Sequence, residues 1–200
     1  MANAPAFAAY PRWAMAAIPT TANTARDGSG TITTVYTAPA TRSVADAVTN
    51  STILLTSATA AFTDADRGAP ITGAGIPAGT TIAAVLSATN VHLSQAATAS
   101  GTGVTIGIVG QGARVDYIQV TQIDANPGAG NVTLFVHDGT NARYYGEFVF
   151  TSTTQPTSAI APETKTLTLS QPILLPPGYS LRCAPTIVKS FVIEAAIGAF

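Results

Sequence analysis

Charged residues are scarce in this chain: only 10% of its 200 residues are Asp, Glu, Lys or Arg, and the net charge is -1. Ordinary soluble domains carry about 25% charged residues. The nine Lys and Arg residues form no basic run, so the sequence does not predict a nucleic-acid partner. Because so weakly charged a surface repels its neighbours poorly, we expect another protein to cover much of it. A monomer with a hydroxyl-coated surface is the alternative.

Long apolar runs are also lacking, and no leader peptide is expected. No stretch approaches the roughly 18 to 20 apolar residues that a membrane-spanning helix needs, although mean hydropathy is +0.32. The Ala-rich start has no basic residue ahead of its apolar part, which Pro5, Pro11 and Pro19 interrupt. This pattern is not that of a signal peptide. We therefore expect no membrane partner, and folding in a cytoplasm.

Cysteine and histidine, which supply many nucleophiles and general bases, are nearly absent. The single cysteine, Cys183, cannot form an intramolecular disulfide, and its apolar neighbours predict a buried structural thiol. His92 alternates with apolar residues and is predicted at the surface. His137 precedes Asp138 at a predicted hairpin tip, where the carboxylate would bind turn backbone. We expect no catalytic residue, and the chain is not predicted to be an enzyme.

Carboxylates are too few and too scattered to predict a metal site. Residues 64–68 are interpreted as a tight turn in which Asp66 accepts backbone N–H groups and Gly68 takes a positive φ. A glycine pair at 101–103 is too short for a phosphate-binding loop. No metal and no cofactor are expected. The loop-side carboxylates lack the spacing of a calcium loop; they are Asp64, Asp66, Asp124, Asp138 and Glu147.

What the chain has in quantity is Thr, Val, Ile, Ala and Gly in short runs. β-Branched segments separated by Gly and Pro turns about every 8 to 12 residues predict an antiparallel β-sandwich or jelly roll. The fold class is therefore all-β. The predicted strands are 31–37, 114–123, 131–137, 142–150, 164–169, 173–175, 180–183 and 190–195, with 52–56, 70–72, 80–86, 90–94 and 104–108 between the first two.

Side-chain alternation assigns faces within two of these strands. In 142–150, Tyr144, Phe148 and Phe150 fall on one face and are interpreted as core, because aromatic residues dominate ordinary cores. A sugar-binding platform that includes Tyr145 is the alternative. In 114–123, strict alternation predicts one face with Val115, Tyr117 and Gln119, and another with Asp116, Ile118 and Val120.

The Thr- and Ala-rich block in the middle looks inserted into a second β-domain. We predict an extended N-terminal arm over 1–29, a discontinuous sandwich domain over 30–44 and 110–200, and a small inserted β-domain over 45–109. Residues 44–48 could form one helical turn. The apolar set of the block is barely adequate for a core of this size; it comprises Ile53, Leu55, Phe62, Ile71, Ile76, Ile82, Val85, Val91, Leu93, Val104 and Ile106.

The predicted arm is unusual because it carries large apolar side chains, which disordered segments normally lack. We interpret these residues as partner-binding. The arm would dock either on a neighbouring subunit or on its own sheet, and the sequence does not separate the two. The residues are Phe7, Tyr10, Trp13, Met15 and Ile18.

Two stretches resemble structural proteins of tailed bacteriophages. The block containing LLTSATAAFTDADRG (54–68), GIPAGTTI (75–82) and VHLS (91–94) resembles a small β-module of such proteins. The surrounding domain, with TVYTA (34–38), LFVHDGT (134–140) and LLPPGYSLR (174–182), is similar to small phage virion proteins. In many of those relatives the first strand runs directly into the next, where here about 70 residues intervene.

The resemblance implies a non-enzymatic virion component, assembled in the cytoplasm of a bacterial host. A capsid decoration protein is the first interpretation, with the major capsid protein or other virion proteins as partners and a homo-oligomer, preferably a trimer. The alternative is a tail, neck or fibre protein whose inserted domain binds a host surface glycan. The resemblance implies no catalytic residue.

Overall fold

The computed structural model describes residues 9–18, 20–124, 128–151, 157, 161–167, 169 and 171–199. The predicted all-β class is confirmed: within these ranges the chain forms fifteen strands and a single short 3-10 turn, η1 (Asp64–Asp66). It divides into two compact units, which are described separately. Unit 1 is Met1–Thr37 with Ala113–Phe200, and unit 2 is Ala38–Gly112. Unit 2 corresponds to the predicted inserted domain, for which the predicted boundaries are 45 and 109.

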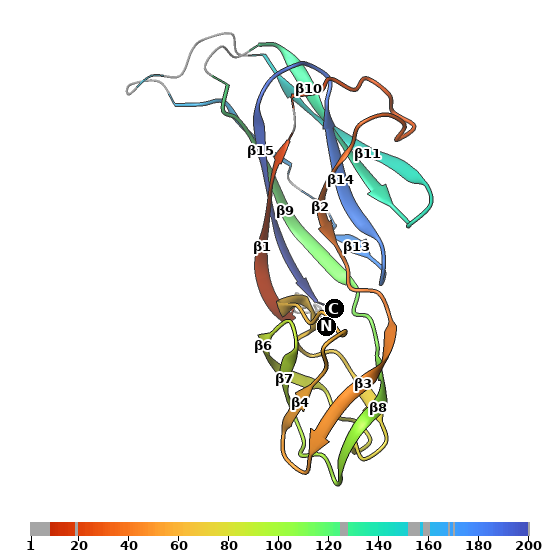
Figure 1. The fold of residues 1–200 in the computed structure, drawn as a ribbon. Helices are drawn as coiled ribbons and strands as arrows, with labels where there is room; N and C mark the ends of the chain where they lie inside the picture. Colours follow the sequence, from red (N-terminus) through yellow and green to blue (C-terminus); the bar gives the residue numbers. More distant parts are fainter. Residues whose placement is uncertain are drawn as a thin grey trace, which may run out of the picture. The chain divides into compact units, whose positions relative to one another are not determined.

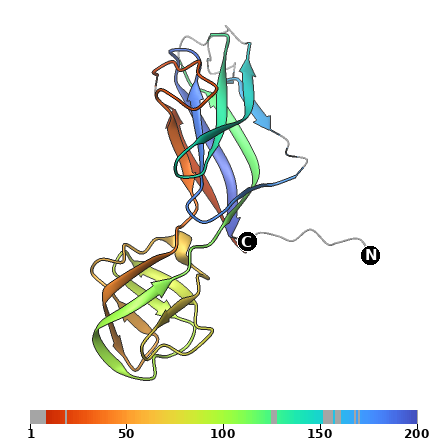
Figure 2. The same ribbon diagram turned by 90° about the vertical axis from the view of Figure 1, so that its right-hand side faces the viewer.

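Unit 1 consists of two antiparallel sheets, visible as layers in Figures 1 and 2. The first has the order β1-β15-β9-β12, and β13 also pairs with β9. The second has the order β11-β10-β14-β2. The strands of the first sheet are β1 (Ala9–Ile18), β15 (Phe191–Ala199), β9 (Ala113–Gln122), β12 (Thr164–Leu167) and β13 (Ile173–Leu175). Those of the second are β11 (Ala142–Phe150), β10 (Gly130–His137), β14 (Ser180–Pro185) and β2 (Thr33–Thr37).

The core of unit 1 lies between these sheets. Phe150 of β11 and Phe191 of β15 join them, with ring centroids 5.0 Å apart. Each fully buried side chain of this size stabilises the fold by about 1.5–3 kcal/mol, so the sheets are held mainly by apolar packing. The surrounding buried residues include Val115, Ile118, Val120, Val132, Leu134, Phe135, Leu175, Leu181, Ile193 and Ile197.

The predicted arm contributes a strand to its own unit. β1 pairs antiparallel with β15, with Trp13 opposite Ala196, Met15 opposite Glu194 and Ile18 opposite Phe191. Of the two docking alternatives, residues 9–18 therefore follow the second, on their own sheet. The sequence did not predict strand β1, because this segment is rich in alanine, which is depleted in strands.

Unit 2 is a curled six-stranded sheet of order β5-β8-β3-β4-β7-β6. Its two ends meet: Ile71 N–H donates to Thr80 O at 3.0 Å, and Ile82 N–H donates to Ala69 O at 3.0 Å. A sheet closed in this way leaves few unpaired edge groups. The strands are β3 (Arg42–Asn50), β4 (Leu54–Thr56), β5 (Ile71–Gly73), β6 (Ile82–Ser87), β7 (Asn90–Leu93) and β8 (Ser100–Ile108).

The core of unit 2 includes most of the predicted apolar set. Ile53 is an exception, because it is 43% exposed and precedes β4. Ile76, Val85 and Val104 are only partly buried against the core. The fully buried residues are Ala47, Leu55, Ala60, Phe62, Ala69, Ile71, Ile82, Val91, Leu93, Ile106 and Ile108.

Three local predictions were wrong. The helical turn at 44–48 is part of β3, because pairing with β8 and β4 determines its conformation. Tyr144 was predicted in the core but is 48% exposed. The pairing of β11 with β10 is irregular at Tyr145, so the alternation that places Phe148 in the core does not extend to Tyr144. In the pairing of β9 with β15, Asp116 has no register partner. The alternation changes there, so Val115 is buried while Tyr117 is not.

Candidate protein-binding face

The side of the first sheet that points away from the core of unit 1 carries exposed apolar side chains. Trp13 and Met15 are each 63% exposed. Residues that alternate with this face along β15 and β9, such as Ile193 and Ile118, are fully buried. They form the opposite, core-facing side of the sheet. We call it the outer face; its residues are Trp13, Met15 and Ala17 of β1, Val192, Glu194 and Ala196 of β15, Tyr117, Gln119 and Thr121 of β9, and Thr164 and Thr166 of β12.

An aromatic pair lies across three strands of the outer face. Trp13, Ala196 and Tyr117 are register partners, and the two rings meet edge to face, 6.0 Å apart at 81°. The small side chain of Ala196 allows the rings on either side to approach. Aromatic pairs of this geometry add about 0.5–1.5 kcal/mol beyond burial, so Trp13 is held in place while remaining exposed.

The next row of the outer face is mixed in chemistry. Met15, Glu194, Gln119 and Thr166 are register partners in that order. The Tyr117 hydroxyl donates a hydrogen bond to Gln119 Oε1 and lies 3.4 Å from Thr166 Oγ1. Glu194 is half-buried, and its carboxylate has no hydrogen bond or ion pair within the described ranges. The face therefore combines an apolar end, a hydroxyl and amide cluster, and one carboxylate.

The predicted partner-binding residues separate into three groups. Trp13 and Met15 lie on the outer face, where a partner can reach them. Ile18 is 3% exposed and belongs to the core, so it is not available. Phe7 and the side chain of Tyr10 lie outside the described residues.

Sequence reasoning missed Tyr117 and Glu194 as parts of this face. Alternation assigned Tyr117 to the side of Val115, and the irregularity at Asp116 reverses that assignment. Glu194 follows Ile193 in a short apolar run, and only the register with Met15 brings it beside the predicted residues.

Cys183 and Asp138, two groups singled out in the sequence, have structural roles in unit 1. Cys183 is buried, as predicted, and burial raises the pKa of its thiol to about 12. Asp138 accepts hydrogen bonds from the N–H groups of Asn141 (2.7 Å) and Thr140 (2.9 Å), which lower the pKa of its carboxyl. Across the described part of the chain, no three His, Cys, Asp or Glu side chains gather in a way that could hold a metal ion.

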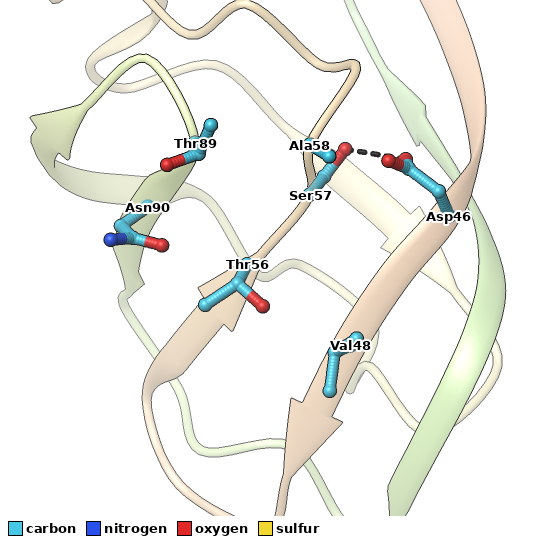
Figure 3. Close-up of a pocket in the computed structure, with 7 residues that line it drawn as sticks. All are labelled: Asp46, Val48, Thr56, Ser57, Ala58, Thr89 and Asn90. Atoms are coloured by element: carbon cyan, nitrogen blue, oxygen red, sulfur yellow. Dashed lines mark hydrogen bonds between the residues drawn. The ribbon is translucent and has the colours of Figure 1, made fainter.

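Unit 2 has an open depression of about 470 Å³. Figure 3 shows Asp46 and Val48 of β3 on one side and Thr89 and Asn90 on the other, with Ser57 bridging toward Asp46. Ser57 Oγ donates to Asp46 at 2.6 Å and Thr59 N–H donates to it at 2.9 Å. The Ser57 hydrogen bond is the main reason that the pKa of Asp46 is lowered.

Comparison with protein-family models, with curated proteins and with solved structures finds no match. Within the described ranges, no helix is long and apolar enough to cross a bilayer.

Proposed function

We propose that the chain is a non-enzymatic structural protein of a tailed-phage particle, a capsid decoration protein that binds the outer capsid surface and stabilises it. The observation that carries the proposal is the outer face, where Trp13 and Met15 are each 63% exposed. Contiguous exposed apolar patches larger than a few hundred Å² mark interaction sites on soluble proteins, and Trp is enriched among the residues that dominate protein interfaces. The low charge and the sequence resemblance to phage virion proteins agree with this proposal.

The outer face is large enough to contribute most of an interface. Three strands about 30 Å long (β1, β15 and β9) and the four-residue strand β12, spaced about 4.8 Å apart, give a face on the order of 500 Å². A standard protein interface needs about 800 Å² from each partner. The face would thus supply the centre of a contact with the major capsid protein, and other surfaces of the chain would complete it and join copies into a homo-oligomer, with a trimer preferred.

Immunogold electron microscopy of intact phage particles, with antibody against this chain, tests the location. Label over the whole head is the expected result. Label confined to the neck or tail would overturn the decoration role, and absence of label would overturn the virion assignment.

Point variants test the face itself, because β1 belongs to the sheet and deleting residues 1–25 would remove a strand. We expect Trp13→Ala and Met15→Ala to weaken co-sedimentation of the full chain with particles that lack it. The matched control is Val149→Ser, an exposed apolar strand residue (54%) on the second sheet of unit 1. Equal binding by all three variants would exclude the outer face.

A second candidate function rests on the depression in unit 2. Hydroxyl, amide and carboxylate groups lie beside Val48 and Ala58 around an open hollow. A sugar has both polar and apolar faces, and a tail, neck or fibre protein would bind a host surface glycan there. Adsorption of the chain to host cells, competed by free sugar and lost in Asn90→Ala, would favour this candidate. Adsorption that sugar does not compete would exclude it.

A further inference from the structure

The carboxylate of Glu194 is the one charge at the centre of the outer face. It lies between Met15 of β1 and Gln119 of β9 in the sheet register. Within the described ranges it has no hydrogen bond or ion pair, and Gln119 Oε1 is already bound by the Tyr117 hydroxyl. Arg114 and Asp116, two charged residues of the neighbouring strand β9, pair with each other at 2.6 Å. Glu194 therefore depends on water while the face is uncovered.

A partner that covers the face must replace that water. A carboxylate transferred from water into an interface without a compensating donor is strongly unfavourable. A cationic side chain on the partner offsets part of this penalty through a charge-assisted hydrogen bond, which is about twice as strong as a neutral one. The face thus selects against a purely apolar partner, although Trp13 and Met15 alone would accept one.

The surroundings of Glu194 also suit the stem of a long basic side chain. Diagonal neighbours on one face of a sheet lie about 7–8 Å apart, which is the relationship of Glu194 to Trp13 through Ala196. A guanidinium or ammonium group bound at Glu194 would approach the indole within the roughly 6 Å range of cation–π attraction. The apolar stem of the same side chain would lie along Met15.

We propose that the outer face binds a protein surface through an Arg or Lys side chain that pairs with Glu194 beside Met15 and Trp13. This inference deepens the proposed function and rests on it for the idea that a protein covers the face. A second copy of the chain bound by a two-fold axis through Glu194 is disfavoured, since it would bring two carboxylates together. The preferred occupant is therefore a different protein with a basic side chain at the contact.

Trp13 is the chain's only tryptophan, so its fluorescence reports on this face. The full chain is titrated with a capped tetra-arginine peptide and, separately, with a capped tetra-glutamate peptide. We expect the arginine peptide alone to change the emission, with saturation in the millimolar range. The change should weaken at high salt, because exposed charges are screened.

Two variants locate the effect. Glu194→Gln keeps the shape of the side chain and should raise the dissociation constant of the arginine peptide by about fivefold, the size expected for a partly exposed ion pair. Asp64→Asn removes one exposed carboxylate from unit 2 (70% exposed) and should leave that constant unchanged. Circular dichroism establishes that both variants fold.

The inference is overturned if the arginine peptide leaves the emission unchanged, if both peptides act alike, or if Glu194→Gln binds as the unaltered chain does. These results would not touch the proposed function, which the immunogold label decides. Conversely, a Glu194-dependent response in a chain that no particle carries would sustain the basic-partner inference and overturn the virion assignment.

Discussion

Arg42 and Asp66 are joined by two parallel hydrogen bonds, Nη1 to Oδ1 at 2.8 Å and Nη2 to Oδ2 at 2.9 Å. The Asp66 side chain is 2% exposed and that of Arg42 is 28% exposed. Asp66 also accepts the N–H of Thr63 at 2.8 Å, while Arg42 Nε donates to Ala60 O at 3.1 Å. The first residue of β3 is thereby bound to the turn η1, so this pair connects two separate segments of unit 2.

Replacing Arg42 should destabilise unit 2 strongly. Arg42→Ala leaves the Asp66 carboxylate buried without its cation, which we expect to cost about 2–4 kcal/mol of unfolding free energy. Urea unfolding followed by circular dichroism measures the loss, and hydrogen exchange should localise it to peptides of residues 38–112. The control is Asp64→Asn, since the exposed pair of Asp64 with Arg67 spans 3.8 Å and such pairs contribute at most about 1 kcal/mol. Equal effects of the two substitutions would contradict the prediction.

Gly28 and Gly139 separate two costs of adding a side chain. Both have positive φ, +80° and +99°, but a Cβ on Gly28 would lie 2.0 Å from Ala142 Cβ, whereas one on Gly139 would meet nothing within 4 Å. Gly139→Ala should therefore lower the unfolding free energy only by the cost of a left-handed backbone at a non-Gly residue, about 1–2 kcal/mol. Gly28→Ala should lower the unfolding free energy by distinctly more, because the loop that contains Gly28 must also move away from β11. Thermal unfolding of the two variants makes the comparison, and a smaller loss at Gly28 would refute it.

Cys183 should be unreactive in the native chain. Its side chain is fully buried, and a thiol pKa of about 12 leaves almost no thiolate at pH 8, the form that attacks disulfide reagents. We expect no reaction with Ellman's reagent over an hour in buffer, and complete reaction in concentrated urea. Rapid labelling without denaturant would show that the interior of unit 1 opens readily.

The alternating strands of this fold could be predicted from the sequence because their β-branched residues and turns carry the signal locally. The run 142–150 matches β11 in its bounds, and the turn at Asp66 and Gly68 has the predicted hydrogen bond and a φ of +83°. What failed depends on pairing. The irregularities beside Asp116 and Tyr145 change which side chains face the core, and no local pattern marks them.

The candidate face shows the same limit. Trp13 and Met15 were predicted to bind a partner because they are large apolar residues in an Ala- and Pro-rich segment, and both are exposed in the structure. Glu194 lies about 180 residues along the chain from Met15, and only strand pairing makes them neighbours. The charge that we propose to select the partner was therefore outside the reach of composition and periodicity.

β1 should behave as a structural strand with one functional face. Ile18→Ala removes a side chain that is 3% exposed and should cost about 2–4 kcal/mol of unfolding free energy, as cavities in cores do. Met15→Ala, at 63% exposure, should change that free energy by less than about 0.5 kcal/mol. Urea unfolding monitored by Trp13 fluorescence compares the two variants. Comparable, small losses would mean that residues 9–18 form a dispensable arm.

The pH dependence of unit 1 should contain a contribution from Glu147. Arg26 Nε donates a hydrogen bond of 2.7 Å to Glu147 Oε1, and this bond is the largest cause of the lowered pKa of the Glu147 carboxyl, with Asn131 adding a second bond. A carboxyl whose pKa is lower in the folded chain than in the unfolded one, about 4.3, stabilises the fold above that pH. The stabilisation is lost as the pH falls through the folded-state pKa.

Arg26→Gln should therefore lower the unfolding free energy at pH 7, and the difference from the unaltered chain should disappear under acid conditions, where Glu147 is protonated in both states. Urea midpoints at pH 7, 5 and 3 measure this. In a Glu147→Gln background, Arg26→Gln should have no pH-dependent effect, which completes a double-mutant cycle. Because the Arg26 side chain is 65% exposed, high salt should reduce the difference at pH 7. An Arg26→Gln effect of the same size at pH 3 and pH 7 would show that the ion pair does not cause it.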